Sequence, residues 1–121
     1  MPRQVPALDK EALLKVIDED AQIRHQYINT SGETCFIGGL LLASGEFTPE
    51  SLREYMSEKN PDWPNYVRNK CRVSQLPHVL SVLRNHYGLS ELEASALQAA
   101  NDTHTSREVR QRDLRKTLDR L

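Results

Sequence analysis

The sequence predicts an all-α protein, a compact bundle of about five to seven helices around a central apolar helix over residues 34–44. Apolar residues recur at steps of three and four in several segments, which is the spacing of one helix face. No segment alternates polar and apolar residues for long enough to predict a sheet. The segment ETCFIGGLLLASGE, residues 33–46, has an apolar stretch that is typical of a helix surrounded by others, although a central strand remains an alternative.

Length and composition fit a single helical domain over residues 1–121, with residues 1–7 as a flexible N-terminal segment. The 38% of hydrophobic residues include few aromatics, 6% of the chain, so we expect a mostly aliphatic core. Two cysteines are too few for a secreted disulfide scaffold, so free thiols in a cytoplasmic setting are expected, with a Cys35–Cys71 pair left open. No apolar run approaches the roughly 20 residues that span a bilayer, which predicts a soluble protein without a membrane partner.

The first helix is expected from Asp9 to about Ile28. Asp9 is a favourable N-cap, and Leu8 before it can form a hydrophobic staple. The stripe at helical spacing consists of Leu13, Val16, Ile17, Ala21, Ile23, His25 and Tyr27. Asn29 and the following Thr-Ser-Gly are typical of the end of a helix.

The central helix is expected to end at Gly45, which can adopt the left-handed conformation of a C-terminal cap. Gly38 and Gly39 lower helix propensity, but they allow another backbone to approach closely. We therefore predict that a second helix crosses the central helix at this glycine pair.

Capping signals predict the other helices. A Thr-Pro-Glu start, a glycine end and a Ser-x-x-Glu capping box mark their boundaries. The expected ranges are 48–57, 76–87, 90–102 and 106–121. In the last of these helices Glu108 stands four residues before Arg112, the spacing of a stabilising ion pair.

Cys35 is a candidate nucleophile because the positive end of a helix dipole can lower the pKa of a thiol. His104, near Asn101 and Asp102 in the sequence, is the candidate base of such a cysteine-dependent hydrolase or transferase. No catalytic signature surrounds Cys35, however, and the leucines that follow it make an apolar site. The preferred interpretation is a buried structural cysteine.

Metal and cofactor sites are not expected. Neither cysteine has a partner at the spacing of a zinc site, and the Gly38-Gly39 pair lacks the flanking pattern of a nucleotide-binding loop. Enzymatic activity is therefore the least favoured function class.

Nucleic-acid binding is possible through residues 90–121. Two predicted helices joined by the turn NDTHTS have the dimensions of a helix-turn-helix, with a basic second helix for the groove. Its basic residues are Arg107, Arg110, Arg112, Arg115 and Lys116. Against this hypothesis, the formal net charge of the chain is −1 and two aspartates interrupt the helix. The alternative is a salt-bridged terminal helix that packs on the bundle.

The segment WPNYVRNKCRV combines aromatic and basic residues, which are frequent in binding hot spots and also suit single-stranded nucleic acid. Its candidate binding residues are Trp63, Tyr66, Arg68, Lys70 and Arg72. If the aromatic side chains instead lie on the core, the surface does not exist.

The order of three sequence elements resembles that of a group of small uncharacterised proteins of actinobacteria and their phages. The elements are Thr34 to Leu40, Tyr87-Gly88-Leu89 and Asn101-Asp102. That group has a C-x-x-G-A-L element and a later Asn-Asp pair, and the resemblance covers about residues 10–121, with Gly39 in place of the alanine. It implies that Cys35, Gly38 and Leu40 are core, that Asn101 and Asp102 cap or tie helices, and that the gene is of phage or accessory type.

The sequence thus favours a small binding protein with a protein partner. The surfaces expected to bind are the Trp63–Arg72 segment and the last helix, with Arg107, Arg110 and Arg112 as its named contacts.

Overall fold

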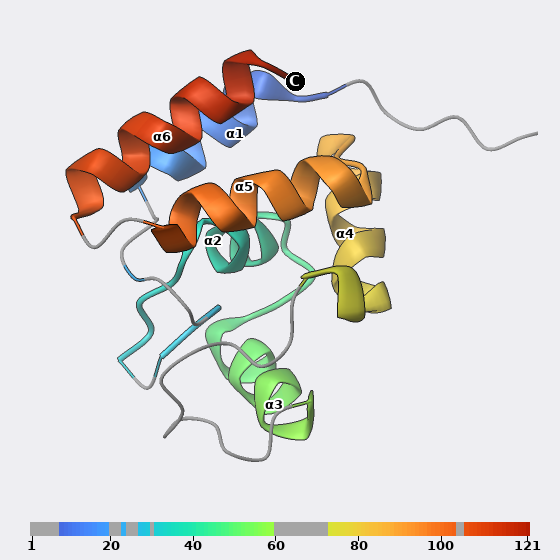
Figure 1. The fold of residues 1–121 in the computed structure, drawn as a ribbon. Coiled ribbons are helices and arrows are strands. Elements are labelled where there is room, and N and C mark those ends of the chain that lie inside the picture. The colour runs from blue at the N-terminus through green and yellow to red at the C-terminus, as the bar shows by residue number, and fades with distance from the viewer. Residues whose placement is uncertain (1–7, 20–22, 24–26, 30, 60–72, 104–105) are drawn as a thin grey trace, which may run out of the picture.

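The computed structural model describes residues 8–19, 23, 27–29, 31–59, 73–103 and 106–121. In this part of the chain it contains six α-helices and one short 3-10 helix, η1 (Figure 1). They are α1 (Lys10–Glu19), α2 (Phe36–Ala43), α3 (Pro49–Lys59), η1 (Val73–Gln75), α4 (Pro77–Tyr87), α5 (Glu91–Thr103) and α6 (Arg107–Asp119). Extended chain is paired here only at an isolated bridge between Ile28 and Thr34. The predicted all-α class is confirmed.

The apolar segment forms the central helix, α2, as predicted. It contacts α1, α4 and α5, and Figure 1 shows it beneath α5, with α6 and α1 above. All six residues from Phe36 to Leu41 are buried, because neighbours cover every side of this part of the helix. Gly45 follows it with a φ of 79°, the left-handed conformation that its lack of a side chain permits.

The outermost helix, α6, packs on both α5 and α1. Its inward stripe consists of Arg110, Leu114 and Leu118, which are all buried. A terminal helix that carries ion pairs and packs on the bundle was expected as one of two alternatives, and α6 packs in this way. None of the helices in the described part of the chain combines the length and the hydropathy needed to cross a bilayer.

The first helix is shorter than predicted. It opens as expected, with Asp9 Oδ1 accepting from the N–H of Ala12 at 3.2 Å, but α1 is described only to Glu19. Ile23, Tyr27 and Ile28 are not helical. Ile23 donates its N–H to the carbonyl of Thr34 at 3.2 Å, so this segment pairs with the chain that enters α2. The expected continuation to about Ile28 is therefore wrong, although Tyr27 and Ile28 are fully buried.

At Gly38 the close neighbour is not a helix. A β-carbon at this position would lie 1.9 Å from the backbone oxygen of Tyr27 and 3.2 Å from the side chain of Thr34. Gly38 is thus needed for a close backbone approach, as predicted, but the approaching chain is the non-helical segment at Tyr27. The predicted helix crossing is wrong at this residue.

The end of α4 and the start of α5 follow the local signals of the sequence. Gly88 has a φ of 73° and donates its N–H to the carbonyl of Arg84 at 3.0 Å, while Leu89 donates to Leu83 at 3.3 Å. At α5, Ser90 and Glu93 exchange hydrogen bonds of 2.9 and 3.2 Å, a capping box. These contacts satisfy backbone groups that helix ends leave unpaired.

Helix α3 is joined to the start of α4 by an aromatic cluster. The ring centroid of Phe47 lies 5.6 Å from that of Tyr55 and 5.4 Å from that of His78. Leu52 and Met56 are buried on the same helix. One face of α3 is thereby fixed inward, and its opposite face is solvent-exposed.

Candidate functional site

Cys35 forms the N-cap of α2 and is only 2% exposed. Its Sγ accepts the N–H of Gly38 at 3.4 Å. Burial, together with the negative charge of Asp102, raises the pKa of the thiol to about 12. A nucleophilic cysteine needs a lowered pKa, so this environment favours the protonated, inert thiol. The predicted burial of Cys35 is confirmed; His104 lies outside the described residues.

Asn101 organises the chain around the start of α2. It is fully buried on α5, and its Oδ1 accepts the N–H of Phe36 at 3.0 Å. Its Nδ2 donates to the carbonyl of Ile23 at 3.1 Å and to Asp102 at 3.0 Å. The expectation that Asn101 ties helices together is confirmed by these contacts. The residue is structural, because its polar atoms already have partners within the protein.

A second buried amide, Gln98, works in the same way one turn earlier on α5. Its Oε1 accepts the N–H of Val73 at 3.0 Å, and its Nε2 donates to the Tyr27 hydroxyl at 2.7 Å. Each end of this amide has a partner within the protein, so Gln98 links α5 to η1 and to the Tyr27 segment.

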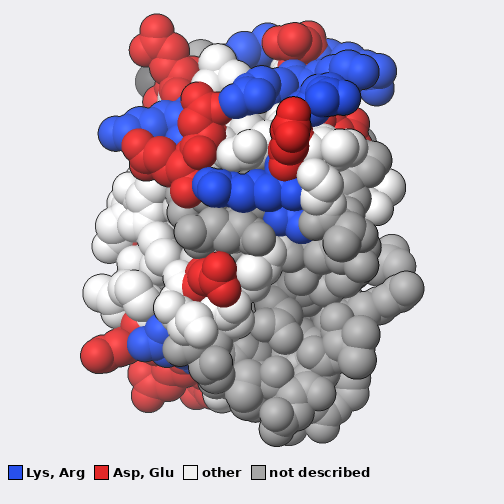
Figure 2. Space-filling model, turned by 90° about the vertical axis from the view of Figure 1, so that its left-hand side faces the viewer, with Lys and Arg blue, Asp and Glu red and all other residues white. Residues whose placement is uncertain are grey.

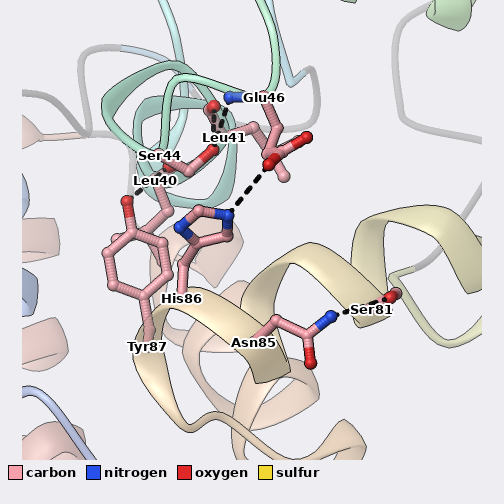
Figure 3. A network of polar contacts seen from close by, with 8 residues as sticks. All are labelled: Leu40, Leu41, Ser44, Glu46, Ser81, Asn85, His86 and Tyr87. Carbon is pink, nitrogen blue, oxygen red and sulfur yellow. Dashed lines mark hydrogen bonds and ion pairs between the residues drawn. The ribbon is translucent and has the colours of Figure 1, made fainter. Parts of the chain in front are cut away.

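The contacts between α2 and α4 are also structural (Figure 3). The Tyr87 hydroxyl donates to the carbonyl of Leu40 at 2.6 Å, and Nε2 of the neighbouring His86 lies 3.2 Å from Oε1 of Glu46. The His86 and Glu46 side chains are 36% and 51% exposed, an environment in which an ion pair contributes little. No described group of three or more His, Cys, Asp and Glu residues is arranged to hold a metal ion.

The predicted aromatic and basic surface belongs to a segment that the structure does not describe. Trp63, Tyr66, Arg68, Lys70 and Arg72 all fall within residues 60–72, outside the described part of the chain.

Helix α6 binds the end of α1 through three polar side chains. Arg107 donates to the carbonyl of Glu19 at 3.1 Å, and Gln111 donates to that of Ile17 at 2.8 Å. One turn further along α6, Arg115 pairs with the carboxylate of Asp18. The last carbonyls of a helix have no intrahelical donor, so α6 supplies the missing partners.

This arrangement corrects part of the predicted binding surface on α6. Arg110 is only 3% exposed and belongs to the inward stripe, so it is not a surface contact. Arg107 is exposed, but its guanidinium is bound to the end of α1. Of the three arginines named from the sequence, Arg112 alone faces outward without serving the contact between α6 and α1.

The outward face of α6 is therefore the best candidate site. Its residues, here called the α6 row, are Val109, Arg112, Lys116 and Arg120, all exposed. Figure 2 shows Lys and Arg side chains gathered across the upper part of the molecule, interleaved with acidic ones. Arg112 lies 3.8 Å from Glu108, whereas no ion pair within the described residues involves Lys116 or Arg120. The sequence reasoning missed Val109 and Arg120, although the spacing of four between the basic residues could have shown the row.

A second charged face, also missed, lies on α3. Glu50, Glu54 and Glu58 are exposed, here called the α3 row, and the same spacing of four residues places them on one side. None of the three forms an ion pair with another described residue.

Comparisons with known proteins add no family to this picture. No protein-family model, curated protein or solved structure matches the chain.

Proposed function

We propose that this protein is a small helical binding module, and that it binds an acidic segment of a partner protein through the α6 row. The observation that supports the proposal most is that the two faces of α6 have different roles. One face holds α1 and α5, while the opposite face exposes Arg112, Lys116 and Arg120, of which the last two have no ion pair among the described residues. These cations are available to a partner.

An acidic protein partner fits this face better than a nucleic acid does. In a helix-turn-helix the residues near the start of the second helix contact base edges. At the start of α6, Arg107 is bound to α1, Arg110 is buried and Glu108 would face the phosphates. Only a short row of cations is left, which is a small electrostatic footprint for DNA. A helix of a partner protein that carries acidic residues four positions apart would match such a row.

Val109 contributes the apolar part of the proposed contact. It is 37% exposed and stands one turn before Arg112 on the same face. Rim charges chiefly set orientation and association rate, whereas desolvated apolar contacts supply affinity. We expect weak, salt-sensitive binding, and we place the protein among cytoplasmic, phage-type accessory proteins that bind a host protein. The Trp63–Arg72 segment remains a second proposed surface for the same function.

The proposal is tested by titrating the ¹⁵N-labelled protein with a synthetic helical peptide that carries glutamates four residues apart. Amide shifts should change on the outward side of α6. The variant Lys116→Glu with Arg120→Glu should weaken peptide binding by at least about tenfold, since attraction is replaced by repulsion.

Lys10→Glu with Lys15→Glu provides the matched control, because both lysines are exposed on α1 and the change in net charge is the same. The affinity of this control should stay within about twofold of the wild type if contact is local. Equal loss in both variants would show that only net charge matters, and tighter binding of a random duplex DNA than of the peptide would favour the nucleic-acid alternative. Either outcome overturns the proposal.

A further inference from the structure

We infer that one partner of the α6 row is a second copy of this chain, and that the row docks on the α3 row of the neighbouring molecule. The inference rests on the proposed function, because it names an occupant for the same face. It predicts that copies associate head to tail.

The outward face of α3 carries acidic residues and no basic ones. Leu52 and Met56 are buried, and Glu50, Glu54 and Glu58 lie on the opposite side of the helix at a spacing of four. The two basic residues of α3 are not members of this row. Arg53 is half-buried, and the Nζ of Lys59 lies 5.5 Å from the centroid of the Tyr55 ring.

The spacing of the two rows is identical. Arg112, Lys116 and Arg120 follow one another at four-residue steps, as do Glu50, Glu54 and Glu58. Each row therefore spans about 12 Å of helix axis, at roughly 1.5 Å per residue. When the two helices lie side by side, every cation of one row can face a carboxylate of the other.

The two rows cannot pair within one molecule. Figure 1 places α6 and α3 at opposite ends of the structure, with α5 and α2 between them. Figure 2, which is turned about the vertical axis and so keeps the same heights, shows basic side chains interleaved with acidic ones at the upper end, and acidic side chains beside a smaller basic group at the lower edge. Pairing of these two rows therefore requires two copies of the chain.

An interface between two different surfaces is heterologous, so each added copy leaves one α6 row and one α3 row unoccupied. The assembly therefore continues as an open chain or closes into a ring. Exposed ion pairs are individually weak and are screened by salt. We expect association that grows with protein concentration at low ionic strength and is lost in concentrated salt.

Analytical ultracentrifugation of the full chain tests this inference with two neutralised variants. The first replaces Arg112, Lys116 and Arg120 by glutamine, and the second replaces Glu50, Glu54 and Glu58 by glutamine. All six side chains are exposed, so folding should be retained, and circular dichroism checks this. Each variant alone should be monomeric at concentrations at which the wild type associates. An equimolar mixture should stop at a dimer, because it offers one intact α6 row and one intact α3 row.

A charge-reversal chain gives an independent readout. Six substitutions combined, Glu50→Lys, Glu54→Lys, Glu58→Lys, Arg112→Glu, Lys116→Glu and Arg120→Glu, exchange the signs of the two rows, so association should return. A wild type that stays monomeric at millimolar concentration and low salt overturns the inference, as does an assembly that persists in either neutralised variant. If the glutamate peptide still binds α6 in that case, the proposed function stands and only the second copy is excluded; if it does not bind, both fail.

Discussion

The backbone N–H of Phe36 donates a hydrogen bond over 3.0 Å to Oδ1 of Asn101, which lies 65 positions further along the chain. Phe36 is the first residue of α2, where backbone donors have no partner within the helix. Asn101 also binds the carbonyl of Ile23 at 3.1 Å. One buried amide on α5 thus fixes both the start of the central helix and the segment beside it.

Replacement of Asn101 by alanine should lower the free energy of unfolding by about 2–4 kcal/mol, because the buried N–H of Phe36 and the partly buried carbonyl of Ile23 lose their partner. Urea denaturation measures the loss. Asn85→Ala is the matched control: Asn85 is exposed on α4 and donates only to Ser81 at 3.3 Å, so its loss should stay within about 0.5 kcal/mol. Similar losses in both variants would contradict the role of Asn101.

Gly38→Ala should destabilise the protein by about 2 kcal/mol or more, although alanine is the better helix former. The added β-carbon would lie 1.9 Å from the Tyr27 oxygen, so the backbone must move. Gly32→Ala is the comparison, because a β-carbon added at Gly32 would have no neighbouring atom within 4 Å. Only the φ of 86° opposes a side chain at this position, and we expect this strain to cost about 1–2 kcal/mol. Thermal unfolding of both variants tests whether Gly38→Ala loses more stability than Gly32→Ala. A smaller loss for Gly38→Ala would show that the Tyr27 backbone can move away from Gly38.

Protein stability should fall as the pH rises above about 9, through the Cys35 thiol. The unfolded chain releases this proton near its usual pKa of 9.0, whereas the folded protein retains it to about pH 12. The contribution of Cys35 to the free energy of unfolding is therefore fully present below pH 9. Above pH 9 it declines by up to about 1.4 kcal/mol per pH unit. Urea titrations between about pH 8 and 10.5 should show this slope in wild type but not in Cys35→Ser.

The accessibility of the same thiol is checked separately. In a Cys71→Ser background, which leaves one of the two cysteines, Cys35 should react with a thiol reagent only in denaturant. Rapid labelling of the folded protein would contradict its burial.

Replacement by alanine should lower protein stability much more at Arg110 than at Arg112. Arg110 is 3% exposed within the inward stripe, so its loss removes buried packing and should cost about 1–3 kcal/mol of stability. The Arg112 side chain is 62% exposed in an i,i+4 pair with Glu108, so its loss should change stability by less than about 0.5 kcal/mol. Chemical denaturation distinguishes them, and equal effects would contradict the inward orientation of Arg110.

Local signals account for most of the helix boundaries that were predicted correctly. Gly88 ends α4, and Ser90 with Glu93 opens α5, because these contacts involve residues close in sequence. The error in α1 has the opposite origin. Ile23, Tyr27 and Ile28 have helical spacing, but pairing with the segment around Thr34 gives their backbone other partners. Spacing alone cannot distinguish the two outcomes, because both bury the apolar side chains.

The candidate site was predicted less completely. Charge and spacing identify α6 as basic and Arg112 as exposed, but they do not show that Arg110 points inward or that Arg107 holds the end of α1. An arginine on an amphipathic helix can bury its stem or extend it into water, and the neighbouring helix decides between them.

The sequence by itself determined the helical class, the central position of residues 36–41 and the caps at Asp9, Gly88 and Ser90, since these depend on periodicity and on contacts a few residues apart. Only the tertiary structure decided which backbone approaches Gly38, that Asn101 accepts the first backbone N–H of α2, and which face of α6 is left for a partner. Those outcomes depend on segments far apart in the chain, whose proximity is set by packing and not by local propensity.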